Sequence, residues 1–312
     1  MKVVILSKGE MLSNLIEGTL DAGCDIAGIF RYERTCTNPL FLKLKDYFNA
    51  SNDYTLIKRY KLHEIKCKSA NSKEFKKEIL KLNADIILVG TWHERLKKDI
   101  INLPAIASIN VHPSLLPKYR GPNPYLQTIL HQEKYSGITF HLMDENFDTG
   151  AILAQKKVDI MPYDTSKELK ERTVFQARIM CQEILKKLEY GMIIPIAQNE
   201  SDASYYKNIT QDDMMLDFEK ETSDQICARI RALHPWLPTY IRYKDKYIIP
   251  NPYKLTILDE FQTKRLIRKP SKAGSIINAD KKQHSITILC KDNKSIKADN
   301  IKIYGFWQRF IR

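Results

Sequence analysis

Short apolar runs alternate with amphipathic segments along the first half of the chain. Lys2 to Ser7 (KVVILS) is predicted as a buried strand, and apolar residues from Leu12 to Leu20 then recur at helical spacing. Strand, helix and strand in this order predict a Rossmann-like, mostly parallel α/β sheet with helices on both faces. The further predicted segments are strands at 25–30, 63–67, 85–90 and 107–112, helices at 72–82 (capped by Ser72) and 97–101, and an irregular helical stretch at 39–60.

The pattern changes after residue 136. Two further strands are predicted at 137–143 and 151–155, and a long helix follows from Thr165 to Tyr190. Thr165 and Glu168 have the spacing of a capping box, and Gly191 is expected to end the helix. Residues 192–208 are typical of a linker.

A second unit is predicted after the linker. Thr222 and Gln225 form another capping box, and the helix that they begin runs to Leu233. Only short β-like runs come afterwards, which favours a small OB-like β-barrel. The chain therefore divides into domains 1–203 and 204–312. The predicted strands of the second domain are 239–243, 247–249, 255–258, 285–289 and 301–304.

Length and composition place the chain among globular proteins. It has 312 residues, of which 43% are hydrophobic, so two domains can each bury a core. The six cysteines are scattered and form no CxxC pair, which favours reduced thiols and a cytoplasmic protein. We expect no signal peptide and no membrane span, because no apolar run approaches the roughly 18 residues that a span requires. His63 and Cys67 have no partner pair, so we predict no metal site.

Positive charge is concentrated near the end of the chain. The formal charge is +13, and residues 251–312 carry 14 Lys or Arg against 5 Asp or Glu, a net of +9. Such a region can attract nucleic acid or another polyanion. The basic residues form no tight run, which favours an ordinary lysine-rich, solvated surface over a polyanion-binding one.

Candidate chemistry begins in the stretch SINVHPSLLPKYRG, residues 108–121. Asn110 and His112 alternate along an apolar run, so both side chains would lie on one face of a strand. Asp148 follows later, in DENFDTG, again where a strand is expected to end. An amide, an imidazole and a carboxylate can supply an oxyanion donor, a proton shuttle and its orienting partner for acyl transfer.

The predicted positions of these residues favour a site over three unrelated structural roles. In an open parallel sheet, ligands bind at the carboxyl ends of the strands. Residues 90–92, 112–121 and 148–150 would all form loops at that edge. Taken singly, Asn110 could satisfy a buried backbone group and Asp148 could belong to an ordinary turn. Together they indicate a site where an amine attacks an acyl or formyl carbon.

Two motifs carry a family resemblance. INVHPSLLPKYRGPNP and GITFHLMDENFDTGAIL resemble the folate-dependent formyltransferases, which include methionyl-tRNA, glycinamide ribonucleotide and sugar N-formyltransferases. The resemblance covers about residues 1–200 and is most specific between 108 and 150. It implies that Asn110, His112 and Asp148 are the catalytic triad and that N10-formyltetrahydrofolate is the formyl donor, with no metal.

The resemblance also implies residues for the two substrates. Those expected to bind the folate are Gly90, Thr91, Trp92, Ser114, Leu115 and Asp144. Those expected to bind the acceptor are Pro117, Tyr119, Arg120 and Gly121. Domain 1–203 would then be the formyltransferase catalytic domain.

The second domain is similar to the C-terminal barrel of methionyl-tRNA formyltransferase, in the stretches SYYKNIT and RALHPWLPTY. Other segments depart from the tRNA enzyme. Ser7 to Leu12 reads SKGEML in place of a GTPxFA-like turn. Residues 31–48 contain no glycine where the tRNA enzyme has a basic RGRG-type loop, and glycine is what lets such a loop approach nucleic acid closely. Pro113 also matches the sugar enzymes better.

These features together predict an N-formyltransferase that acts on the primary amine of an amino sugar, either nucleotide-linked or a precursor of a surface glycan. The alternative is a methionyl-tRNA formyltransferase, which the C-terminal barrel and its charge of +9 support. A third hypothesis is a catalytically silent binding protein that kept the fold. The expected partner is a small amine acceptor, with tRNA as the partner under the alternative; no membrane partner is expected, and a homodimer stays open.

Overall fold

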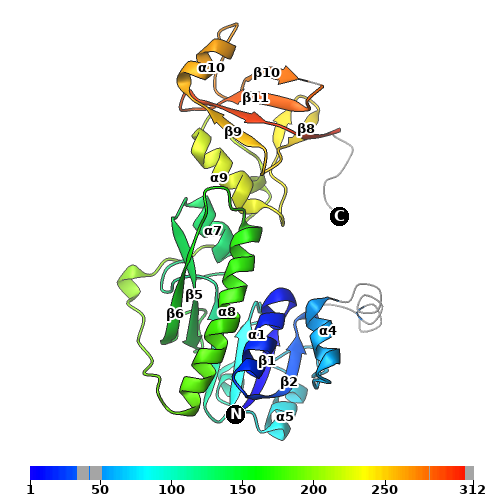
Figure 1. The fold of residues 1–312 in the computed structure, drawn as a ribbon, viewed down its shortest axis with the longest axis vertical. Helices are drawn as coiled ribbons and strands as arrows, with labels where there is room; N and C mark the ends of the chain where they lie inside the picture. The colour runs from blue at the N-terminus through cyan, green and yellow to red at the C-terminus, as the bar shows by residue number, and fades with distance from the viewer. Residues whose placement is uncertain (34–41, 43–50, 281, 306–312) are drawn as a thin grey trace. The chain divides into compact units, whose positions relative to one another are not determined.

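The chain forms two compact units in a computed structural model that describes residues 1–33, 42, 51–280 and 282–305. The first unit comprises residues 1–124, 135–159 and 170–206. The second comprises residues 125–134, 160–169 and 207–312 (Figure 1). Two short segments that precede residue 170 therefore belong to the second unit.

A six-stranded sheet forms the centre of the first unit (Figure 1). Its order is β2-β1-β3-β4-β5-β6, in which the first four strands are parallel and β5 pairs antiparallel with both β4 and β6. This arrangement confirms the predicted α/β fold. The strands are β1 (Lys2–Ser7), β2 (Asp25–Arg31), β3 (Ile86–Gly90), β4 (Ala107–His112), β5 (Tyr135–Leu142) and β6 (Ile152–Asp159).

Helices cover both faces of this sheet. Val3 and Ile5 of β1 pack on one side with α1 (Gly9–Asp21), α4 (Asn52–Arg59) and α8 (Ser166–Glu189). Val4 and Leu6 pack on the other side with α5 (Lys73–Leu82) and α6 (Lys98–Ile101). A strand buried on both faces must be apolar at consecutive positions, which is why KVVILS does not alternate.

Several predicted helix boundaries are confirmed. Ser72 caps α5, since its hydroxyl accepts a hydrogen bond from the Phe75 backbone at 3.1 Å. At the start of α8, the Thr165 backbone N–H donates to the Glu168 carboxylate at 2.9 Å. Gly191, just after the last turn of α8, has a φ of +64°, as expected of a residue that ends a helix. Within the part of the chain that the structure describes, no helix is long and apolar enough to cross a membrane.

The predicted strand at His63 to Cys67 is wrong. Only Glu64 pairs with the sheet, through an isolated bridge to Ile29. Ile65 is the one fully buried side chain between His63 and Cys67, so the segment lacks the apolar residues that an internal strand needs. The helical stretch predicted at 39–60 lies partly outside the described residues; its described part contains α4.

The second unit contains two antiparallel sheets, with orders β10-β11-β12-β9 and β13-β8-β7. Helix α9 (Ser223–Leu233) begins with the predicted capping box of Thr222 and Gln225. The sequence failed to predict β10 and α10, which are partly or largely exposed, and β12, whose few apolar residues stand beside polar ones. The elements are α7 (Pro124–Leu130, with Pro124 in the first unit), β7 (Ile241–Tyr243), β8 (Lys246–Ile249), β9 (Leu255–Leu258), α10 (Glu260–Leu266), β10 (Ile276–Asp280), β11 (Ser285–Leu289), β12 (Ser295–Ala298) and β13 (Lys302–Gly305), with short 3-10 helices at Glu200–Asp202 and Asp212–Met214.

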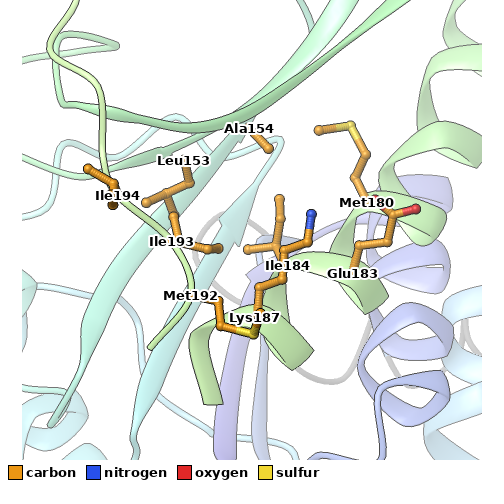
Figure 2. Close-up of a pocket in the computed structure, with 9 residues that line it drawn as sticks. All are labelled: Leu153, Ala154, Met180, Glu183, Ile184, Lys187, Met192, Ile193 and Ile194. Atoms are coloured by element: carbon orange, nitrogen blue, oxygen red, sulfur yellow. The ribbon is translucent and has the colours of Figure 1, made fainter. Parts of the chain in front are cut away.

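A cavity of about 160 Å³ lies between α8 and β6 in the first unit. Figure 2 shows the apolar side chains of α8 and β6 around it, with the residues just after α8 closing one side. Small Ala154 lies where a larger apolar side chain would fill space. The lining residues are Leu153, Ala154, Met180, Glu183, Ile184, Lys187, Met192, Ile193 and Ile194.

Candidate active site

Strand β4 places an amide and an imidazole on the same face of the sheet. Ile109 and Val111 point into the core on the side of α1 and α8, so Asn110 and His112 point to the opposite side. Asn110 pairs with Val89 of β3 in parallel register and with His141 of β5 in antiparallel register. The site therefore lies where the sheet changes from parallel to antiparallel, at the carboxyl end of β4.

Asp148, in the loop between β5 and β6, joins these side chains. Its Oδ1 atom lies 3.3 Å from Nδ1 of His112 and accepts a hydrogen bond from Nδ2 of Asn110 at 3.3 Å. Its Oδ2 atom accepts a hydrogen bond from the Gly121 backbone at 3.0 Å. The structure thus brings the three residues of the predicted triad together, with Asn110 and His112 both in contact with the Asp148 carboxylate.

His141 is a fourth member of this cluster, and sequence reasoning missed it. Its Nδ1 lies 2.7 Å from the backbone oxygen of Leu142, and its Nε2 lies 3.0 Å from the amide nitrogen of Asn110. Because a carbonyl oxygen can only accept, Nδ1 carries the ring proton and Nε2 accepts from Asn110. Because side chains alternate between the two faces of a strand, the sequence of β5 could have suggested His141. Its pairing with Asn110 could be predicted only from the register of β4 and β5.

The two histidines differ in their electrostatic environment. Burial acts to lower the pKa of His112, but the Asp148 carboxylate and a hydrogen bond to the Tyr119 carbonyl raise this pKa above its usual value. Burial lowers the pKa of His141 to about 4. Burial alone would raise the pKa of Asp148, but the charge and hydrogen bond of His112 hold it at about 2. His141 is therefore neutral near pH 7, while Asp148 is ionised and favours a charged His112.

The loop after β4 is tied to the site through its backbone. Nε2 of His112 lies 2.9 Å from the Tyr119 carbonyl, to which it donates. Ser114 is fully buried, and its hydroxyl donates to the Lys118 carbonyl at 2.7 Å. The side chain of Leu115 packs against Gly137 of β5. Of the residues predicted to bind the folate, Ser114 is thus engaged within the loop and Leu115 against β5.

Other residues predicted to bind the acceptor contact the segment after α8. The Pro117 carbonyl accepts from the Ser204 backbone at 3.2 Å. Arg120 is buried, and its guanidinium bonds to Glu200 and Gln198. Gly121 has a φ of +110°, and a side chain there would overlap the Tyr206 carbonyl.

Trp92, at the carboxyl end of β3, belongs to an aromatic cluster. Its ring centroid lies 5.3 Å from that of Phe30 and 5.4 Å from that of Tyr32. Gly90 is buried, and the exposed Thr91 that follows it has a φ of +52°. The structure thus places the three residues 90–92 together at the edge of the sheet, with Trp92 packed against its neighbours.

A cavity of about 380 Å³ lies beside the end of β5. Asp144 is the predicted folate-binding residue in its wall, and its carboxylate accepts from the Thr149 hydroxyl at 2.7 Å. Ile101 and Met143 are the apolar side chains of its wall, and the other five are polar or charged. Among the described residues, no group of His, Cys, Asp and Glu could hold a metal ion. The lining residues are Lys98, Ile101, Asn102, Met143, Asp144, Glu145 and Asn146.

The fold and the site together define a two-unit α/β protein with an amide, an imidazole and a carboxylate in contact at the end of a central strand. Comparison with known families agrees with this class. The chain belongs to the formyl transferase family: residues 1–185 match the model described as "Formyl transferase", and residues 208–305 match "Formyl transferase, C-terminal domain".

Methionyl-tRNA formyltransferases from several organisms are similar to this chain in sequence. A methionyl-tRNA formyltransferase of Caldanaerobacter subterraneus is 35% identical over 191 residues, which are 61% of this chain and 61% of that relative. One from Lachnospira eligens is 29% identical over 297 residues, covering 93% and 88% of the two chains. The match to the first relative therefore spans about three fifths of its length.

The similar solved structures share the fold over almost the whole chain. An N-formyltransferase from Helicobacter canadensis, in complex with folinic acid and dTDP-3-aminofucose, superposes with a TM-score of 0.67 at 19% identity, covering 96% of this chain and 99% of that one. The sugar 3N-formyl transferase WlaRD, in the presence of dTDP and 5-N-formyl-THF, gives 0.65 at 17% identity, with 96% and 97% covered.

Proposed function

We propose that this protein transfers a formyl group from N10-formyltetrahydrofolate to the primary amine of an amino sugar. The observation that carries this proposal is the single carboxylate of Asp148, which contacts both Asn110 and His112 at the end of β4. These are the groups that formyl transfer to an amine requires: a hydrogen-bond donor for the developing oxyanion and an imidazole that can move a proton.

Asn110 stabilises the negative charge that forms on the formyl oxygen when the amine attacks. One hydrogen of its amide nitrogen is held by His141 at 3.0 Å. The other makes a longer contact of 3.3 Å to Asp148, and this hydrogen turns to the oxyanion. A single such donor contributes roughly 3 kcal/mol to the stability of the transition state.

His112 moves the proton that the reaction displaces. When Nε2 of neutral His112 leaves the Tyr119 carbonyl, it accepts a proton from the attacking nitrogen and then delivers it to the departing folate nitrogen as the carbon–nitrogen bond breaks. Asp148 stabilises the intervening imidazolium, in keeping with the raised pKa of His112. The amine loses one proton and the folate gains one, so the step is balanced.

The cavity beside β5 is the proposed place for the pterin of the donor. Ile101 and Met143 give it apolar walls, while Asn102 and Asp144 give it polar edges. The bound folate supplies the activated formyl group. The protein orients that group towards Asn110.

Two sequence features favour an amino sugar over tRNA as the acceptor. Residues 31–48 contain no glycine, and residues 7–12 depart from the turn of the tRNA enzymes. The similar structures described above include sugar formyltransferases with nucleotide ligands. The alternative acceptor, methionyl-tRNA, is supported by the curated relatives and by the net charge of +9 in residues 251–312.

The test is a panel assay with N10-formyltetrahydrofolate as donor and nucleotide amino sugars or charged initiator tRNA as acceptors. We expect formylation of an amino sugar, with a KM that changes little between 50 and 200 mM salt. Formylation of tRNA with binding that weakens steeply over the same range would support the alternative, because phosphate contacts release counterions. No transfer to any amine would reject both.

A further inference from the structure

The segment from Gln198 to Tyr206, here named the brace, lies against the loop that carries Arg120 and Gly121. The Arg120 backbone N–H donates to the Ser204 carbonyl at 2.9 Å, and the Tyr206 N–H donates to the Arg120 carbonyl at 3.0 Å. A parallel bridge joins Arg120 and Tyr205. The brace and the loop are about 80 residues apart in sequence, and the two are joined by backbone pairing.

Gln198 connects the brace to the backbone around Asp148. Its amide nitrogen donates to the Asp148 carbonyl and to the Gly150 carbonyl, each at 2.8 Å. Its amide oxygen accepts from Nη2 of Arg120 at 2.7 Å. Both ends of this one amide are thus fixed, because the nitrogen must face carbonyls and the oxygen must face the guanidinium.

Arg120 is held in turn by Glu200. The two guanidinium nitrogens Nη1 and Nη2 donate to the two carboxylate oxygens at 2.9 and 2.7 Å, a bidentate pair of fixed geometry. The arginine side chain is only 8% exposed, whereas that of Glu200 is 69% exposed. A buried arginine paired in this way is a rigid support for Gln198.

The backbone at Asp148 needs such support. Asp148 has a φ of +60°, a left-handed conformation that costs an L-residue about 1 kcal/mol or more. The same brace also reaches His112 through Tyr119, whose N–H donates to the Ser204 hydroxyl at 2.9 Å and whose carbonyl accepts from His112 at 2.9 Å. One segment therefore holds both partners of the Asp148–His112 pair.

We propose that Gln198 and Arg120 are positioning residues, which hold Asp148 against His112 and thereby set the protonation of the imidazole. The proposal rests on the proposed function only for its activity readout. The charged or titratable groups around His112 are Asp148, Arg120 and His141. Of these, Asp148 raises the affinity of His112 for a proton, and Gln198 holds the backbone that carries it.

The test is Gln198→Met, which keeps the side-chain volume and removes both ends of the amide. The matched control is Gln182→Met, because Gln182 makes the same kind of bond, to the Asp21 carbonyl at 2.9 Å, in a different part of the first unit. His112 is titrated by NMR in both variants, with its signal assigned by its loss in His112→Gln. We expect His112 to titrate at lower pH in Gln198→Met than in the unsubstituted protein, and to be unchanged in the control.

Formyl transfer gives the second readout. We expect kcat to fall about tenfold or more in Gln198→Met while KM for the amine changes much less, since a small misplacement of a catalytic group costs up to about 100-fold. An unchanged His112 titration together with unchanged kcat would overturn the proposal. If no acceptor is formylated at all, the NMR titration still tests the brace, so the two failures are distinguishable.

A second variant guards against loss of folding. Glu200→Ala removes an exposed carboxylate and frees Arg120. We therefore expect His112 to titrate at lower pH, as in Gln198→Met, but with a smaller shift. Its control is Glu219→Ala, which removes an exposed carboxylate paired with Lys272 in the second unit. Equal His112 titrations in Glu200→Ala, Glu219→Ala and the unsubstituted protein would contradict the role given to Arg120.

Discussion

Nε2 of His141 lies 3.0 Å from the amide nitrogen of Asn110, across the antiparallel pair that β4 and β5 form. Because the other ring nitrogen of His141 donates to the Leu142 carbonyl, Nε2 can only accept. The contact therefore fixes which end of the Asn110 side chain presents N–H groups. A free asparagine could turn its carbonyl oxygen towards an oxyanion and repel it.

Removing this contact is expected to weaken catalysis without removing a catalytic group. His141→Ala should lower kcat about tenfold, because Asn110 can then rotate away from its donor orientation. His141→Gln should retain more activity, since its amide can accept from Asn110. Steady-state kinetics measures both, with His63→Ala as an exposed histidine control. Equal activity in His141→Ala and the unsubstituted protein would remove His141 from the site.

Asn110 and His112 are expected to be far more sensitive. Asn110→Ala and His112→Ala should each reduce turnover at least about 100-fold, because one removes the proposed oxyanion donor and the other the proposed proton shuttle. Thermal unfolding of each variant checks that the fold is intact. Normal turnover in either variant would exclude that residue from the mechanism.

The protonation of His141 is expected to make the free energy of unfolding depend on pH. Its folded pKa of about 4 lies below the usual 6.5. A group whose pKa is lowered by folding stabilises the protein above its unfolded pKa, and this contribution is lost as the pH falls towards the folded pKa. Between pH 7 and pH 5 the loss from His141 is on the order of 2 kcal/mol.

The measurement is urea unfolding of the unsubstituted protein and of His141→Gln at pH 7 and pH 5. Other groups titrate in both proteins, so the difference between the two isolates His141. We expect the unsubstituted protein to lose more free energy of unfolding than the variant. Identical losses would show that His141 titrates normally in the fold.

The sequence predicted only those features of this site that follow from the pattern of neighbouring residues. The two-residue period of SINVH placed Asn110 and His112 on one face, and that much follows from strand geometry alone. His141 was missed because its position opposite Asn110 depends on which strands pair and in what register. Gln198 was missed because nothing in residues 192–208, expected as a linker, shows that they return to the site.

The errors in the fold have the same origin. The segment from His63 to Cys67 contains enough β-forming residues to suggest a strand, yet only Ile65 is fully buried. Strands β10 and β12 contain few apolar residues, so their pairing with β11 is what defines them. The pattern of apolar and polar residues predicts a helix or strand where one face is continuously apolar. It fails where pairing with distant segments decides whether a strand forms.

The cavity between α8 and β6 gives a prediction about packing rather than chemistry (Figure 2). Ile184 is 3% exposed in its wall, so Ile184→Ala should lower the free energy of unfolding by about 3 kcal/mol. Ala154→Leu adds apolar surface to the empty volume and should raise it by about 1 kcal/mol. Ile196→Ala, at a side chain that is 67% exposed, is the matched control and should change it by less than about 0.5 kcal/mol. Urea unfolding measures all three, and a destabilised Ala154→Leu would show that the cavity is too narrow to accept the larger side chain.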